Sequence, residues 1–167
     1  VAPAALDAGI EQSAVQLARA AIEAMQGVGT FGVEMFLLTS GEVLINEISP
    51  RVHNAGHYTM EACVSSQFEQ HLRAITGLPL SDTRQRQPAA MRNVLCTTAL
   101  ERENRLREAA ILKSGDVAEH WYGKTPARAM RKLGHLTATA DTTDESVRLV
   151  NRHWDDIQNT ASTVAVR

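Results

Sequence analysis

A mixed α/β (α+β) fold is predicted by three patterns in this sequence. Apolar residues recur at three- and four-residue steps from Ile10 to Met25, which predicts an amphipathic helix over 10–26 that ends at Gly27. Two β-rich runs, 31–38 and 43–48, flank a polar turn and predict a hairpin. Strand-like and helical runs then alternate beyond residue 88. We therefore expect helices and strands to share each core.

The remaining elements follow from local signals. Ser66 and Glu69 fit a capping box, so a helix is predicted over 66–76, with Gly77 and Pro79 as stop signals. Polar residues predict a loop over 51–58, and residues 78–88 have the composition of a linker. We expect a first domain over 1–78 and a second over 79–167. The second should contain strands at 89–96, 117–122 and 134–140, and helices at 99–112 and 143–154.

Composition indicates an ordinary soluble globular protein, with 44% apolar and 22% charged residues. No apolar run approaches the roughly 20 residues of a membrane span, and residues 1–4 do not resemble a signal peptide. A cytoplasmic protein without membrane contact is expected. Because the sequence lacks an initiating Met and runs at once into a helical pattern, it begins as though cut from a longer chain. Cys63 and Cys96 form no metal-binding or disulfide pattern and are expected to be buried thiols.

Charge is distributed unevenly along the chain. Residues 1–80 carry a net charge of −5 and residues 81–167 one of +3, for a total of −2. A chain so close to neutrality lacks the broad basic face that nonspecific nucleic-acid binding requires. Any anion site is therefore expected to be local.

Two glutamates interrupt the apolar pattern of the predicted hairpin. If the turn is centred between Ser40 and Gly41, Glu34 and Glu47 pair directly and their Cβ atoms lie roughly 5 Å apart on one face. Like charges placed this way repel unless a cation lies between them. Magnesium commonly takes one or two carboxylates and completes its shell with water and phosphate oxygens. Ser49 would lie on the same face as a possible third oxygen.

A second interpretation of this pair needs no metal. The glutamates are ordinary surface charges if the strands face solvent, and a register slip of one residue would send them to opposite faces. Spacing alone does not separate the two interpretations.

At this point several motifs resemble a known family. Val33-Glu34-Met35-Phe36 and Ile45-Asn46-Glu47-Ile48-Ser49-Pro50-Arg51 resemble the metal-binding hairpin of ATP-grasp enzymes. The continuation Val52-His53-Asn54-Ala55-Gly56-His57-Tyr58-Thr59 is similar to 5-(carboxyamino)imidazole ribonucleotide synthetases, the ATPase subunit of phosphoribosylaminoimidazole carboxylase. Segments 66–73, 121–124 and 128–135 resemble the same family. The likeness runs from about residue 2 to 140, and its motifs occur in the family's order.

The resemblance implies a C-terminal subdomain of an ATP-grasp module followed by a small β-rich C-terminal domain. The implied activity is ATP-dependent carboxylation of 5-aminoimidazole ribonucleotide by bicarbonate, through carboxyphosphate, in purine biosynthesis. Glu34 and Glu47 would hold magnesium, and Asn46 would assist with the nucleotide. Arg51 would act in catalysis, because a guanidinium presents a planar fork to bicarbonate or carboxyphosphate.

The resemblance also assigns substrate contacts. His53, Asn54 and His57 would face bicarbonate and the imidazole, although loop histidines that only bond their neighbours are an open alternative. Lys124, Arg131 and Lys132 would bind the ribose 5-phosphate, where the alternative is a solvated basic loop. Arg128 is not assigned to this phosphate site, because its neighbours Ala129-Met130 replace the Pro-Gly that the family often has there.

The resemblance leaves part of the family's machinery outside this chain. The N-terminal half of the same enzyme, with its ATP-binding lysines and glycine-rich flap, is absent from the 167 residues, so we expect the chain alone to be inactive and the complete enzyme to be a homodimer. Other interpretations remain: another ATP-grasp carboxylating or formylating ligase, or a non-catalytic folded or dimerisation module.

Overall fold

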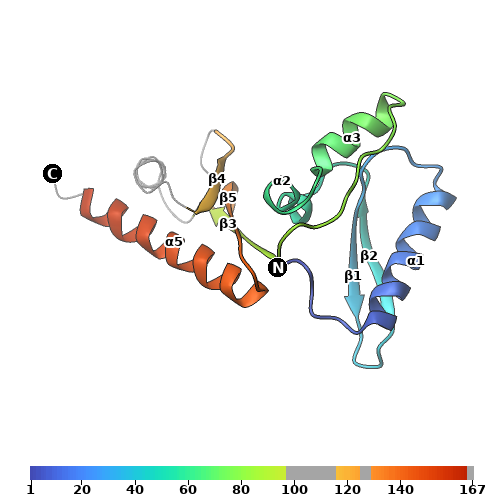
Figure 1. Cartoon of the computed structure of the whole chain (residues 1–167), viewed down its shortest axis with the longest axis horizontal. Coiled ribbons are helices and arrows are strands. Elements are labelled where there is room, and N and C mark those ends of the chain that lie inside the picture. Colours follow the sequence, from blue (N-terminus) through green and yellow to red (C-terminus); the bar gives the residue numbers. More distant parts are fainter. Residues whose placement is uncertain (97–115, 125–128, 165–167) are drawn as a thin grey trace. The chain divides into compact units, whose positions relative to one another are not determined.

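The computed structural model describes residues 1–96, 116–124 and 129–164, and these form two compact units (Figure 1). The N-terminal unit comprises residues 4–86, and the C-terminal unit comprises residues 1–3 and 87–167. The mixed α/β character predicted from the sequence is confirmed. The predicted helix at 99–112 and the side chain of Arg128 lie outside the described residues.

The N-terminal unit is built on a two-stranded antiparallel hairpin. Helix α1 packs along strand β2 of this hairpin, and the short elements η1 and α2 lead into α3 (Figure 1). The predicted hairpin and the two predicted helices are confirmed. The short helix η1 lies within the predicted loop 51–58, and α2, directly after that loop, was not predicted. The elements of the unit are α1 (Ala8–Ala24), β1 (Gly32–Leu37), β2 (Val43–Ser49), η1 (Asn54–Gly56), α2 (Thr59–Ala62) and α3 (Gln67–Ile75).

Side-chain caps define where the two longer helices of this unit begin. The Asp7 carboxylate accepts from the N–H of Gly9 at 2.8 Å at the start of α1. Ser66 Oγ accepts from the N–H of Glu69 at 3.2 Å at the start of α3, as the capping pattern predicted. The Glu69 carboxylate bonds Arg73 Nε at 2.8 Å, one helical turn further on.

The boundary between the units lies after Arg86 rather than after residue 78 as expected. The predicted linker bonds back onto the N-terminal unit, which explains the difference. Val64 N–H donates to the Arg84 carbonyl at 2.9 Å, and Ser65 Oγ donates to the Asp82 carbonyl at 2.6 Å. Because its polar backbone is satisfied by this unit, the segment folds with it despite a linker-like composition.

The C-terminal unit is a three-stranded antiparallel sheet covered on one face by a long helix. The sheet has the order β3-β5-β4, with β5 in the centre. The backbone of Ala2 pairs with Ala89, which joins residues 1–3 to this unit. The elements are β3 (Ala89–Leu95), β4 (Val117–Trp121), β5 (Lys132–Thr139) and α5 (Thr143–Val164). All three strands were predicted, but α5 continues beyond its predicted end at 154.

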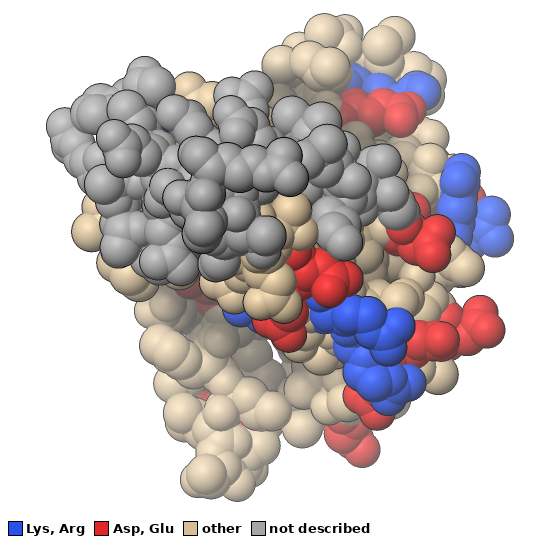
Figure 2. All heavy atoms as spheres, turned by 90° about the vertical axis from the view of Figure 1, so that its left-hand side faces the viewer, with Lys and Arg blue, Asp and Glu red and all other residues tan. Residues whose placement is uncertain are grey.

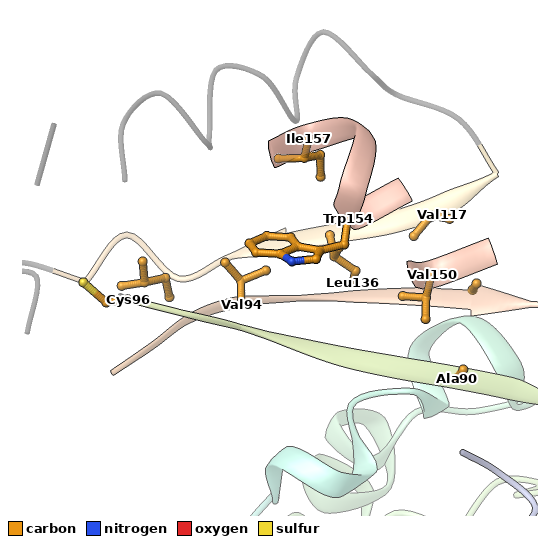
Figure 3. Close-up of a cluster of buried hydrophobic side chains, with 10 residues drawn as sticks. Ala90, Val94, Cys96, Val117, Leu136, Val150, Trp154 and Ile157 are labelled. Atoms are coloured by element: carbon orange, nitrogen blue, oxygen red, sulfur yellow. The ribbon is translucent and has the colours of Figure 1, made fainter. Parts of the chain in front are cut away.

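The apolar core of the C-terminal unit lies between α5 and the sheet (Figure 3). Trp154 and Ile157 of the helix lie over Val94, Leu136 and Val117 of the three strands. Ile157 is fully buried, which explains why the helix continues past the predicted end. Cys96 lies at the edge of this core, and both cysteines are buried thiols, as expected.

The N-terminal unit leaves much more apolar surface uncovered. None of the α1 residues is fully buried. Among the described residues, every exposed large apolar side chain except Val1 and Met130 belongs to this unit. Phe36 and Leu44, which pair on one face of the hairpin, are 56% and 41% exposed. A surface of this kind usually marks an interface.

Charged side chains do not gather by sign on the face shown in Figure 2. Acidic and basic groups of the described residues lie beside one another there. None of the described helices is long and apolar enough to cross a membrane.

Leu136→Ala should destabilise the C-terminal unit by about 2–5 kcal/mol, because Leu136 is fully buried in the centre of the sheet. Both tryptophans of the chain, Trp121 and Trp154, belong to this unit, so fluorescence during urea unfolding reports on it selectively. Arg148→Ala, at an exposed position of α5, is the control and should change stability by less than about 0.5 kcal/mol. Equal stability of the two variants would contradict the packing described here.

Candidate functional site

The two hairpin glutamates are direct cross-strand partners. Glu34 pairs with Glu47, as predicted, but Met35 pairs with Ile45, so Asn46 is an extra residue in β2 that forms a β-bulge. The uniform register assumed from the turn was therefore wrong between the bulge and the turn. The extra residue shifts the register by one position, and only this shift brings the two carboxylates opposite each other.

Each carboxylate has a polar neighbour that orients it. Ser49 Oγ donates to Glu47 Oε1 at 2.9 Å, so this hydroxyl positions Glu47. His53 Nε2 lies 3.4 Å from Glu34 Oε1, and the His53 ring accepts at Nδ1 from the N–H of Ala55 at 3.4 Å. Because Nδ1 accepts, the proton of the neutral ring is on Nε2, facing Glu34. The substrate loop predicted from the sequence is thus tied to a predicted metal ligand.

The donor set suits magnesium better than a metal that needs several protein ligands. In the described part of the chain, no group of three or more His, Cys, Asp or Glu side chains could hold a metal ion. The Glu34 side chain is 49% exposed. Two accessible carboxylates that leave most of a coordination shell to water and phosphate fit the habits of magnesium.

The loop after β2 carries the other predicted site residues of this unit. The exposed Arg51 donates through a guanidinium nitrogen to the Val52 carbonyl at 3.1 Å, and its backbone N–H bonds the Ser49 carbonyl at 2.8 Å. Asn54 begins the short helix η1. The ring of His57 stacks on Phe68 of α3 with centroids 5.5 Å apart. The loop is therefore ordered by contacts with α3.

Gln67 is a residue of this site that the sequence interpretation missed. Its amide contacts the backbone of His53 and the ring of His57. In the sequence, a glutamine directly after a helix cap is an ordinary residue of the first helical turn. No local pattern therefore predicts that the Gln67 amide contacts His53 and His57.

Two titratable groups beside the loop are perturbed by burial. Burial raises the pKa of the Tyr58 phenol, and the nearby Cys63 raises it further. Burial likewise raises the pKa of the Cys63 thiol, while the Arg86 charge acts in the opposite direction. Both groups therefore favour their neutral forms, and Cys63 lacks the low pKa of a reactive thiol.

The predicted phosphate-binding cations belong to the C-terminal unit. Lys124 follows β4, whereas Arg131 and Lys132 lie at the start of β5. These strands are antiparallel neighbours, with Trp121 opposite Gly134, so the three cations belong to the same end of the sheet. Lys124 Nζ lies 4.9 Å from the centre of the Tyr122 ring.

A polar network supports this end of the sheet. Tyr122 Oη and His135 Nδ1 are 2.7 Å apart, and His135 stacks on His120 with centroids 4.5 Å apart. Met130 has a positive φ of 62°, a conformation that glycine adopts without strain and that other residues adopt at a cost. Hydrogen bonds hold this turn: Met130 N–H donates to the Cys96 carbonyl, and Cys96 N–H donates to the Arg131 carbonyl, each at 2.8 Å.

Both parts of the chain match known protein families. The ATP-grasp domain family matches residues 1–68. The family described as phosphoribosylaminoimidazole carboxylase C-terminal domain matches residues 89–148. The two matches fall on different structural units over most of their lengths.

Individual relatives agree with these assignments. The chain is 44% identical over 153 residues to phosphoribosylaminoimidazole carboxylase of Schizosaccharomyces pombe, covering 88% of this chain and 28% of that protein. It is 39% identical over 154 residues to N5-carboxyaminoimidazole ribonucleotide synthase of Bacillus subtilis, covering 92% of this chain and 39% of the relative. The chain thus spans well under half of the length of these relatives.

Solved structures show the same likeness. A carboxyaminoimidazole ribonucleotide synthase from Aspergillus clavatus, complexed with ATP, matches with a TM-score of 0.84 and 40% identity, covering 95% of this chain and 42% of that one. A second structure from that organism, with ADP and 5-aminoimidazole ribonucleotide, has a TM-score of 0.82 and 39% identity, covering 93% and 42% of the two chains. By sequence and by fold, this chain belongs to the N5-carboxyaminoimidazole ribonucleotide synthase family and spans the C-terminal part of its members.

Proposed function

We propose that this chain is the C-terminal part of an ATP-dependent ligase that carboxylates 5-aminoimidazole ribonucleotide with bicarbonate. The observation that carries the proposal is the direct pairing of Glu34 and Glu47 on an accessible face of the hairpin. The names of the matched relatives and the ligands of the Aspergillus clavatus structures support the same chemistry. A cytoplasmic location and a homodimer of the complete enzyme belong to the proposal.

In this proposal Glu34 and Glu47 hold magnesium beside the phosphates of ATP, and Asn46, the bulge residue next to Glu47, assists with the nucleotide. Magnesium, when bound, neutralises charge on the transferring phosphoryl group. Ser49 and His53 keep the two carboxylates oriented. These protein groups thus prepare a site for a cation before any nucleotide arrives.

The remaining site residues bind anions. Arg51 uses one guanidinium nitrogen on the Val52 carbonyl, and its other N–H groups can bond bicarbonate or carboxyphosphate. Lys124, Arg131 and Lys132 bind the ribose 5-phosphate, since several cations on a turn can converge on one phosphate. His53, Asn54 and His57 contact bicarbonate or the imidazole ring of the substrate.

The uncovered apolar surface of the N-terminal unit supports the view that the chain is one part of a larger active enzyme. Exposed Phe36 and Leu44 lie on the same hairpin face as the paired glutamates. An enzyme that excludes water from phosphoryl transfer needs this face covered. The matched relatives possess additional chain that this sequence does not contain.

Glu34→Gln and Glu47→Gln, each in the full-length enzyme, should lower ATP turnover by at least about a hundredfold, because each removes a magnesium ligand. Thermal stability should be unchanged or slightly higher, since the repulsion between the two carboxylates is relieved. Glu42→Gln in the exposed turn of the same hairpin is the matched control. Turnover equal to that of the control in both variants would remove the metal assignment.

The 167-residue chain alone should show no bicarbonate-dependent ATP hydrolysis. Phosphoryl transfer depends on positioning, and this chain supplies only the carboxylates and the anion-binding loops. Phosphate release measured with and without bicarbonate checks this expectation. Sustained hydrolysis by the purified chain would show that it contains a complete nucleotide site.

Lys124→Ala and Lys132→Ala in the full-length enzyme should each raise the KM for 5-aminoimidazole ribonucleotide roughly ten- to hundredfold. Each charge-assisted hydrogen bond to phosphate contributes about 1.5–3 kcal/mol. The KM for ATP should hardly change. Arg148→Ala, which removes an exposed cation from α5 of the same unit, should leave both constants unchanged. A specific rise in the KM for ATP in either lysine variant would contradict the phosphate assignment.

A further inference from the structure

Gln67 makes more contacts than its place at the start of α3 requires. The residue is only 7% exposed. Its backbone N–H donates to Thr59 Oγ1 at 2.9 Å. Its side-chain Oε1 accepts from the N–H of His53 at 2.9 Å, and Nε2 lies 2.8 Å from the His53 carbonyl and 2.8 Å from His57 Nδ1. One amide thus connects α3 to both histidines of the loop.

The backbone of His53 determines which way this amide faces. A backbone N–H can only donate, so the side-chain atom that meets it must be Oε1. A backbone carbonyl can only accept, so its partner must be Nε2. Reversing the amide would break both bonds at once. The orientation of Gln67 therefore follows from the chemistry of its partners rather than from a choice between similar atoms.

This orientation determines the tautomer of His57. The amide NH2 is a donor without acceptor capacity, so His57 Nδ1 must accept its second hydrogen. A ring nitrogen that accepts carries no proton, and the proton of the neutral ring is then on Nε2. Stacking on Phe68 holds the plane of the ring. The same logic places the His53 proton on Nε2, facing Glu34.

The space around the amide is shaped to fit it. A Cβ atom on Gly56 would lie 2.5 Å from Gln67 Oε1, far inside van der Waals contact. Gly56 also contributes to the loop through its carbonyl, which accepts from Thr59 Oγ1 at 2.6 Å. The absence of a side chain at residue 56 lets the amide lie directly against the loop.

We propose that Gln67 is a positioning residue that fastens the loop 53–57 to α3 and fixes His57 as the Nε2–H tautomer. Any acceptor, in the protein or on a bound anion, then meets His57 Nε2 as a hydrogen-bond donor. The ring serves the carboxylation site by stabilising anionic oxygen, and it does not act as a base through Nε2. The role of the loop in catalysis rests on the proposed function, whereas the tautomer of His57 does not.

Gln67→Glu tests the tautomer with almost no change in shape. A carboxylate only accepts, so His57 must place its proton on Nδ1 to bond it. Two-bond ¹H–¹⁵N correlation spectra of the ¹⁵N-labelled 167-residue chain, recorded near pH 8 where an ordinary imidazole is neutral, distinguish the tautomers. We expect Nε2–H in the wild type and Nδ1–H in Gln67→Glu. An Nδ1–H wild type, or an unchanged tautomer in a folded Gln67→Glu chain, would overturn the proposal.

Gln70→Glu is the matched control on the same helix. The Gln70 side chain also bridges to backbone and hydroxyl groups, with Nε2 donating to Ser65 Oγ at 2.5 Å and to the Ser81 carbonyl at 2.8 Å, but it bonds neither histidine. Its variant should leave the His57 tautomer unchanged. Gly56→Ala provides a second test should Gln67→Glu fail to fold, because it displaces the amide without altering its chemistry. We expect this variant to show both His57 tautomers, and a single unchanged tautomer would count against the proposal.

Kinetics of the full-length enzyme separate this inference from the proposed function. Gln67→Glu should lower kcat/KM for bicarbonate-dependent turnover by about tenfold or more, with the KM for ATP unchanged. If the tautomer switches while kcat/KM stays at the wild-type value, His57 has no part in the reaction and the catalytic half of the inference is overturned. If the wild-type enzyme carboxylates no aminoimidazole ribonucleotide, the proposed function fails, while the spectra still decide the role of Gln67.

Discussion

The constraint on which the N-terminal unit depends is that side chains alternate between the two faces of a strand. One extra residue, Asn46, resets this alternation in the middle of β2. Without it, Glu47 would turn towards the face that packs against α1, and Ile48 would lose its half-buried position. The bulge thus serves two requirements together: it keeps the apolar residues of β2 against the helix and places two like charges side by side on the accessible face.

Like charges at such close range are tolerated because of where they lie. The Glu34 side chain is about half exposed, so water weakens the repulsion. The ring of His53 lies beside one carboxylate, and Ser49 donates a hydrogen bond to the other. Burying the same pair without a cation would be costly. An accessible, pre-oriented pair is therefore a physically reasonable state for a cation site before the cation is bound.

Local patterns predicted most elements, because helices, strands and caps are encoded by neighbouring residues. Ser66 is the capping residue, and the three strands of the C-terminal unit occur close to their predicted positions. The features that were missed depend on distant partners. The bulge at Asn46 leaves no distinctive residue pattern, and the end of α5 depends on Ile157 entering a core made by three strands.

The same dependence on distant partners explains which residues of the candidate site could be predicted from the sequence. Glu34 and Glu47 could be identified because charges interrupt an apolar run, whereas Gln67 looks like any polar residue in the first turn of a helix. Its contacts join residues fourteen and ten positions away, and only the fold brings them together. The pairing of the two glutamates was predicted correctly from an incomplete argument, since the turn-based register fails between the bulge and the turn.

The uncovered face around Phe36 and Leu44 has a thermodynamic consequence. The hairpin with α1 behind it has little core of its own, so a part that covers the other face would add substantially to its stability. If the covering part is a separate molecule, mass action applies, and the apparent stability of the N-terminal unit rises with the logarithm of that molecule's concentration. If the covering part belongs to the same polypeptide, its effective concentration is fixed by the connection between the two parts. Covering this surface then contributes a constant amount to the free energy of folding.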